Sequence, residues 1–162
     1  MRLGEGVEWA LHCATVLALL PPDVTLPGSR LAEFHDVPPA YLAKTLQALS
    51  RAGIVESAAG RGGGYRLGRP AAEITLLEVV MAVEGVEPSF RCSEIRRRGP
   101  ARVATRLYSP VCAIAEVMYR ADAAWRAELN GVTVADLVGR LAATVHPDAA
   151  VKGAAWFQEV LS

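Results

Sequence analysis

Three cysteines, Cys13, Cys92 and Cys112, offer the most distinctive chemistry in this chain of 162 residues. Their odd number and the absence of a secretory pattern in the first residues argue against a disulfide framework, so we expect reduced thiols and a cytoplasmic protein. Cys13 lies in an apolar run and is expected to be a small buried residue. Cys92 and Cys112 flank a basic segment, where their thiols are free for metal binding or redox chemistry.

A carboxylate and an imidazole stand four residues apart, at Glu8 and His12. On a helix this spacing places both side chains on one face, whereas Cys13 points about 100 degrees away. The spacing alone favours a surface pair, and a shared metal is the alternative. His35 and His146 are expected to be surface residues.

The elements that position these residues begin with a helix over residues 6–20, which ends at two prolines. Ser29 is predicted to cap a short helix over residues 30–35. A third helix starts at Pro39 and is closed by Gly53, and its apolar face carries Leu42, Leu46 and Leu49. Two short helices, the second with a polar outer face, predict a helix-turn-helix.

The run IVESAAGRGGGYRLG at 54–68 predicts a β-hairpin around a glycine-rich turn. A tight turn is the simplest interpretation of the glycines, but a hairpin directly after a recognition helix is typical of a DNA-binding wing. A nucleotide-binding loop is disfavoured because no Lys-Ser/Thr pair follows. The residues expected to contact DNA are Pro39, Ala40, Tyr41 and Lys44 of the helix and Arg61 of the wing.

Helices are also predicted over residues 75–83 and 134–145, the latter capped by Thr133 and Asp136. Between them, Cys112 opens a long helix whose apolar residues recur every three or four positions. This stripe favours dimerisation over an ordinary core helix, and it comprises Ile114, Met118, Ala121, Trp125 and Leu129. The tail beyond Pro147 is not assigned.

The predicted fold class is mainly α with a small β-hairpin, a winged helix-turn-helix followed by a long dimerisation helix. We expect a DNA-binding domain at 1–85, a sensor loop at 86–111, and the dimerisation and C-terminal helices at 112–162. Net charge is zero, but residues 37–70 hold five basic residues and one acidic residue, and residues 91–106 hold six arginines and one glutamate. Such basic islands suit contact with DNA phosphates. The longest apolar run, at 10–20, is too short to cross a membrane.

Three segments, VEWAL, PPAYLAKTLQALSRAGIVESAAGRGGGYRL and ITLLEVVMAVEG, together resemble the IscR/NsrR/RsrR (Rrf-type) family of bacterial winged-helix regulators over roughly residues 4–145. The resemblance implies a homodimer that binds operator DNA, is not an enzyme, and in many members carries an iron-sulfur cluster. The chain departs from the commonest pattern, in which three cysteines lie close together in the loop.

The segments VEWALHC and FRC-EIR-RGP are closest to the RsrR-like branch, which holds a 2Fe-2S cluster through two cysteines, one histidine and one glutamate. The resemblance therefore implies the ligands Glu8, His12, Cys92 and Cys112, with loop and first helix contributed by different chains. Trp9 is expected to pack beside this site. The function implied is a transcriptional regulator whose operator affinity follows the redox state of the cluster. The alternative is a cluster-free regulator with a thiol or small-molecule sensor.

Overall fold

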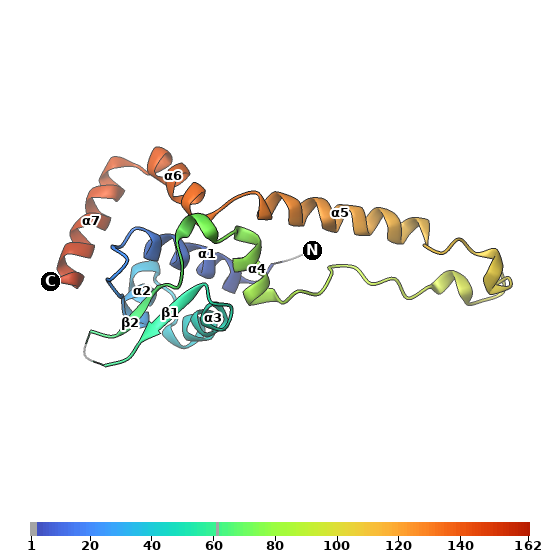
Figure 1. Ribbon diagram of the computed structural model, residues 1–162, viewed down its shortest axis with the longest axis horizontal. Coiled ribbons are helices and arrows are strands. Elements are labelled where there is room, and N and C mark those ends of the chain that lie inside the picture. Colours follow the sequence, from blue (N-terminus) through green and yellow to red (C-terminus); the bar gives the residue numbers. More distant parts are fainter. Residues whose placement is uncertain (1–2, 61) are drawn as a thin grey trace.

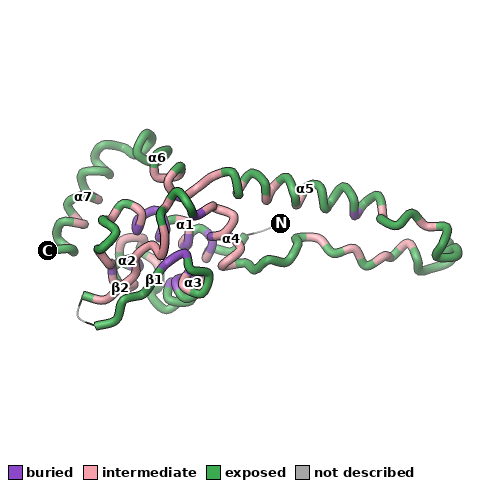
Figure 2. Tube along the Cα trace, viewed as in Figure 1, coloured by how far each residue is buried: buried purple, intermediate pink, exposed green. Residues whose placement is uncertain are grey.

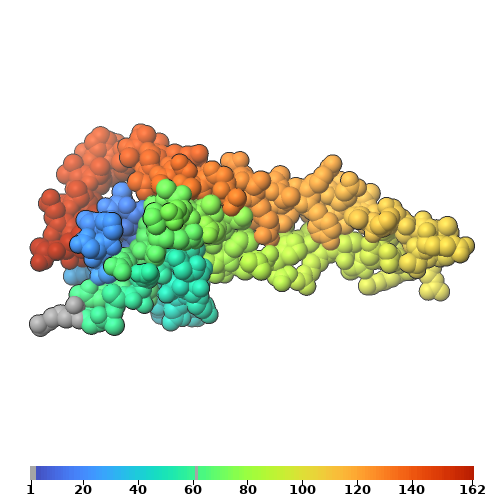
Figure 3. Space-filling model, in the orientation of Figure 1, coloured from blue at the N-terminus to red at the C-terminus, as the bar shows by residue number. Residues whose placement is uncertain are grey.

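A computed structural model describes residues 3–60 and 62–162, in which a rounded body carries a long, thin arm (Figures 1 and 3). The described residues form seven α-helices, two strands and three short 3₁₀ helices. The α-helices are α1 (Glu5–Ala18), α2 (Gly28–His35), α3 (Pro39–Arg51), α4 (Leu76–Glu84), α5 (Ala113–Asn130), α6 (Val134–Thr144) and α7 (Pro147–Leu161). The strands are β1 (Val55–Ala58) and β2 (Gly64–Leu67), and the 3₁₀ helices are η1 (Ala71–Glu73), η2 (Ile95–Arg97) and η3 (Thr105–Leu107). The predicted fold class is confirmed.

Helix α1 is the centre of the body and contacts α3, α4 and α6. Its buried residues, among them Val7, Ala10, Ala14 and Leu17, recur at three- and four-residue spacing and join the main hydrophobic core. The side chains of Glu8 and His12 lie on the exposed face of the same helix. The buried face therefore fixes the direction in which this pair points.

Helices α2 and α3 form the predicted helix-turn-helix, joined at Asp36, which adopts a left-handed conformation with φ 50°. Aspartate tolerates this conformation better than most residues. The prediction that Ser29 caps α2 is wrong, because Pro27 is the N-cap and Ser29 lies inside the first turn.

Strands β1 and β2 pair antiparallel, from Val55 opposite Leu67 to Ala58 opposite Gly64, as the sequence predicts for a wing. The hairpin is tied to the body where Leu26 and Tyr65 exchange two backbone hydrogen bonds. A Cβ on Gly64 would lie 2.5 Å from the backbone of Leu26, so this close approach requires glycine.

The arm comprises residues 86–130, a loop that leaves the body after α4 and the helix α5 that returns to it (Figure 1). Beyond α5 the chain pairs with the segment that precedes α4, where Leu76 N–H donates to Val132 O and Val134 N–H donates to Ile74 O. Thr75 caps α4, and the predicted cap of α6 by Thr133 and Asp136 is confirmed. The starts of α4 and α6 are therefore adjacent in the body, although α4 and the whole arm lie between them in the sequence.

The tail that sequence patterns leave unassigned forms α7, which starts with Pro147 at its first turn. Trp156 and Phe157 of α7 pack on Phe34 of α2, with ring centroids 4.9 and 5.3 Å away. Trp156 Nε1 also donates to Glu33 Oε1 at 3.4 Å. These contacts attach the end of the chain to the helix-turn-helix.

Among the described residues, no helix is both long and apolar enough to cross a membrane.

Candidate functional site

Helix α3 presents one face to the core and the opposite face to solvent. Leu42, Leu46 and Leu49 are fully buried, whereas Tyr41 is 59% exposed and Lys44 is exposed beside it. The Lys44 ammonium lies 5.6 Å from the centroid of the Tyr41 ring. Pro39 and Ala40 are exposed at the start of the same helix. The predicted DNA-contact residues of α3 therefore share one accessible surface.

The predicted wing contact, Arg61, lies outside the described residues. The glycines on either side, Gly60 and Gly62, have φ of 94° and 81°, a region that strongly favours glycine. These two glycines suit a tight turn between β1 and β2.

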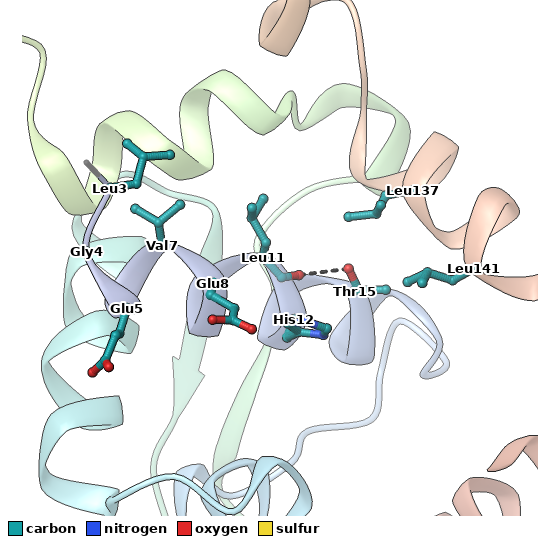
Figure 4. Close-up of a pocket in the computed structure, with 10 residues that line it drawn as sticks. All are labelled: Leu3, Gly4, Glu5, Val7, Glu8, Leu11, His12, Thr15, Leu137 and Leu141. Carbon is teal, nitrogen blue, oxygen red and sulfur yellow. Dashed lines mark hydrogen bonds between the residues drawn. The ribbon is translucent and has the colours of Figure 1, made fainter. Parts of the chain in front are cut away.

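Glu8 and His12 project from the same side of α1, as Figure 4 shows. With Leu11, Leu137 and Leu141 they line an open cavity of about 550 Å³ between α1 and α6. They also line a smaller space of about 190 Å³ that includes Trp9 and His35. The carboxylate and the imidazole are accessible from outside the protomer.

Cys92 and Cys112 lie on the arm, Cys92 in the loop and Cys112 as the N-cap of α5. Both thiols are free and half-buried. The backbone N–H groups of Ala115 and Ile114, followed by the charge of Arg96, lower the pKa of Cys112. A helix N-terminus and a nearby guanidinium both favour a thiolate, so Cys112 is prepared to ligate a metal or to react.

Arg96 organises the loop that carries these thiols. Its guanidinium pairs with Glu94 at 2.7 Å and donates to Ser109 O at 2.7 Å. Arg96 O accepts a hydrogen bond from the Tyr108 hydroxyl at 2.8 Å. The hydrogen bond to Glu94 is the main cause that raises the pKa of Arg96, and smaller contributions come from Cys112 and Cys92. The sequence groups Arg96 with Arg97 and Arg98, as solvated residues or as residues that could stabilise a cluster or touch DNA, and nothing in the pattern singles out Arg96.

The two pairs of potential ligands belong to different parts of the molecule, Glu8 and His12 in the body and Cys92 and Cys112 on the arm (Figure 1). Across residues 3–60 and 62–162, no three His, Cys, Asp or Glu side chains converge as a metal site. One protomer therefore does not bring the four residues together.

Cys13 has the buried position expected for it, with no exposed surface. Burial raises the pKa of its thiol to about 12, so the thiol stays protonated at neutral pH. Cys13 is therefore unsuited to metal binding or redox chemistry, and the candidates for such chemistry are Cys92 and Cys112 on the arm.

The prediction that His35 is a surface residue is wrong. The side chain is half-buried, its ring centroid lies 5.4 Å from that of His12, and burial lowers its pKa, as does the charge of His12. His35 stands three and four residues after Ala32 and Leu31, which are both buried, so helical periodicity could have placed it on the inner face of α2.

The stripe predicted for dimerisation lies along α5 and is open to solvent at its start. Ile114 is 68% exposed and Met118 and Ala121 are also exposed, whereas Trp125 and Leu129 are half-buried. Large apolar side chains in this state are typical of an unpartnered interface.

Comparisons with known proteins bear on this arrangement. A family model described as Rrf2, iron-dependent transcriptional regulator, matches residues 3–140. A curated relative, described as an HTH-type transcriptional regulator (YwgB) of Bacillus subtilis strain 168, is 38% identical over 85 residues. That match covers 52% of this chain and 54% of the relative, so the chain spans about half the length of this relative.

Two solved structures share the fold. CymR (YrzC), the global cysteine regulator of B. subtilis, has a TM-score of 0.69 at 22% identity and covers 86% of this chain and 98% of its own. IscR of T. potens has a TM-score of 0.67 at 17% identity and covers 90% of this chain and 93% of its own. The predictions of a regulator family and of a protein that is not an enzyme are confirmed. The chain belongs to the Rrf2 family of transcriptional regulators.

Proposed function

We propose that this regulator binds operator DNA as a homodimer and that a 2Fe-2S cluster shared between the two protomers controls the binding. The observation that carries the proposal is the division of the four potential ligands between the body and an exposed arm. A divided site makes a complete set of ligands only when two chains combine.

DNA binding is supported by the accessible surface of α3. The N-terminal residues of a recognition helix contact base edges in the major groove, which is where Pro39, Ala40 and Tyr41 lie. Lys44, one turn further, suits a phosphate or a guanine. Arg61 on the wing is expected to contact phosphate or the minor groove.

The homodimer is supported by the exposed apolar stripe of α5. Winged-helix proteins commonly bind DNA sites made of two half-sites, so two recognition helices are needed, one from each protomer. Pairing of α5 with its copy would cover the predicted stripe, Ile114, Met118, Ala121, Trp125 and Leu129.

The residues present fit a 2Fe-2S cluster in number and chemistry. Such a cluster needs four protein ligands, and histidine replaces cysteine on one iron in some centres. Glu8 and His12 of one protomer and Cys92 and Cys112 of the partner subunit would hold it. When bound, the cluster would supply a one-electron redox change, and an imidazole ligand raises its potential relative to four thiolates.

A route from the ligand pair to the DNA surface runs through Trp9. This side chain follows Glu8 in α1 and packs edge-on against Tyr41 of α3, with ring centroids 6.5 Å apart. A shift of α1 at Glu8 and His12 would therefore displace Tyr41. A difference in operator affinity of about 1 to 3 kcal/mol between two states suffices for regulation.

The cluster is tested by complementation between two variants. The Glu8→Ala/His12→Ala chain and the Cys92→Ser/Cys112→Ser chain are each expected to lack the visible absorption of the cluster after anaerobic reconstitution. A heterodimer of the two, isolated with two different affinity tags, retains one complete set of ligands and should bind half the iron and sulfide of the wild-type dimer. His146→Ala, a substitution of an exposed histidine, is the control and should leave iron content unchanged. A colourless heterodimer contradicts the shared site, and a colourless wild type contradicts the cluster.

DNA binding is tested with fragments selected from a random DNA pool. Lys44→Ala should weaken binding by about tenfold or more in a mobility-shift titration. Lys152→Ala on α7 removes an equal charge from another exposed helix and should have little effect. Equal effects of the two substitutions contradict docking through α3.

A second candidate is a thiol switch without a cluster, favoured by the free thiols around Arg96 and by the lowered pKa of Cys112. CymR of Staphylococcus aureus has been solved in an oxidised form. Here hydrogen peroxide would take two electrons and two protons from the thiols, forming a Cys92–Cys112 disulfide and two waters. The colourless product and the loss of two hydrogens in the intact mass distinguish this switch from the cluster.

A further inference from the structure

A second cavity lies between α1, α2, α6 and α7, with a volume of about 480 Å³. This is within the range of small-molecule sites. Its walls carry no Asp, Glu, Lys or Arg side chain. The larger apolar side chains of the walls include Val16 of α1, Leu19 just after it, Phe34 of α2, Val138 and Leu141 of α6, and Phe157 of α7.

Three polar side chains, those of His12, Thr15 and His35, lie on these walls. The Thr15 hydroxyl is already engaged, because it donates to Leu11 O at 2.7 Å. His35 Nε2 is buried and has no hydrogen-bond partner among the described residues. The cavity therefore offers few hydrogen-bonding groups, and these are mainly the imidazoles of His12 and His35.

Apart from Phe157, the α7 wall is made of small residues, which are Ala149, Ala150, Gly153 and Ala154. Gly153 stands in the interior of the helix, where glycine is less favourable than alanine. A Cβ built on Gly153 would meet no atom within 4 Å, so packing within the protomer does not require glycine. The small side chains keep open a space that the protomer itself leaves unfilled.

We propose that this cavity binds a small, uncharged, largely apolar molecule with one hydrogen-bonding group. The apolar walls disfavour a charged ligand, since its charge would meet no Asp, Glu, Lys or Arg side chain in the cavity. The lining residues lie on or next to α1, α2, α6 and α7 of one protomer, and His12 is shared between this cavity and the proposed cluster site. A ligand there would contact α1 beside His12 and α2 at Phe34 and His35, which links it to the helix-turn-helix.

The test uses N-phenyl-1-naphthylamine, a neutral fluorescent probe with a single N–H group, and the full chain. Wild type should give a saturable fluorescence increase with one probe per chain. Gly153→Leu places a side chain in the cavity and should weaken binding by about tenfold or more. Gly139→Leu is the matched control, because Gly139 is also an open glycine inside a helix but does not line the cavity.

Ala150→Leu fills the same space from a neighbouring position and replaces Gly153→Leu if circular dichroism shows that variant unfolded. Equal probe affinity of the filled variants and Gly139→Leu, or no saturable binding to wild type, overturns the proposal. A loss of oligomeric mass by light scattering confined to the filled variants identifies a second copy as the occupant, which also overturns it.

Discussion

The body and the arm differ in what holds them together. The body buries a continuous apolar core, whereas in the arm, residues 86–130, all of which are described, Ala115 is the one buried residue (Figure 2). Burial of apolar surface is the main stabilising contribution to folding. The body therefore has its own source of stability and the arm does not.

Polar contacts hold the two segments of the arm against each other. Ser89 donates to Asp122, and Arg126 donates to the carbonyls of Val86 and Glu87. Exposed polar contacts of this kind contribute little free energy because water competes for both partners. The arm leaves its apolar stripe on α5 exposed, whereas the body buries its own hydrophobic core.

The thiols provide the sharpest test of this difference. Cys13 has no exposed surface and its pKa is raised to about 12, whereas the pKa of Cys112 is lowered. At pH 7.5 the thiolate fraction of Cys112 is therefore much larger than that of Cys13. Because the thiolate is the reactive form, iodoacetamide should label Cys112 of the metal-free protein more than about a thousandfold faster than Cys13. Peptide mass spectrometry measures both rates, and denaturation in urea should make them similar. Comparable rates in the native protein contradict a closed body.

The same substitution in the two regions should have very different effects on folding. Leu46→Ala removes a fully buried side chain of α3 and should lower the free energy of unfolding by about 2 to 5 kcal/mol. Ile114→Ala removes one that is 68% exposed and should cost less than about 0.5 kcal/mol when the protein is diluted to monomers. Urea denaturation followed by circular dichroism measures both. Similar losses would show that the arm belongs to the same cooperative unit as the body.

Local patterns predicted most of the body. The buried leucines of α3, the hairpin around its glycines and the cap of α6 by Thr133 all follow from contacts between residues close in sequence. Helix α7 was missed because its anchor, the packing of Trp156 and Phe157 on Phe34, joins residues more than a hundred positions apart. Periodicity within the tail carries no information about such a contact.

The candidate site shows the same limit. The residue types and spacing of Glu8 and His12 place them on one face of α1, as observed. The proposal that they share a site with Cys92 and Cys112 came from the resemblance, and no local pattern could supply it, since the described chain keeps the two pairs apart. A site completed by a second protomer has no signature in the spacing of one sequence.

The interface proposed for the arm can be tested on a single helix. Met118→Asp places a charge in the exposed stripe of α5 and should weaken dimerisation by about tenfold or more, since a buried charge without a partner is costly. Ala123→Asp introduces the same charge on the opposite face of α5 from Ile114 and is the control. Sedimentation over a concentration series measures the dissociation constants. If both substitutions weaken dimerisation equally, the dimer interface does not lie on the predicted stripe.

The smallest expected effects come from removing side-chain hydrogen bonds, once in the body and once in the arm. The Thr75 hydroxyl caps α4 by accepting from Glu78 N–H, and Thr75→Ala should lower the free energy of unfolding by about 1 kcal/mol. The Tyr108 hydroxyl accepts from Val103 N–H and donates to Arg96 O, so Tyr108→Phe removes two hydrogen bonds.

Despite the larger number of bonds lost, Tyr108→Phe should change global stability by less than about 0.5 kcal/mol, because the loop opens locally without exposing the core. Its effect should appear as faster amide exchange in a peptide covering residues 96–108, whereas Thr75→Ala should accelerate exchange across the body. If Tyr108→Phe lowers global stability as much as Thr75→Ala does, the loop contributes to the folding of the body and the division between the two regions is wrong.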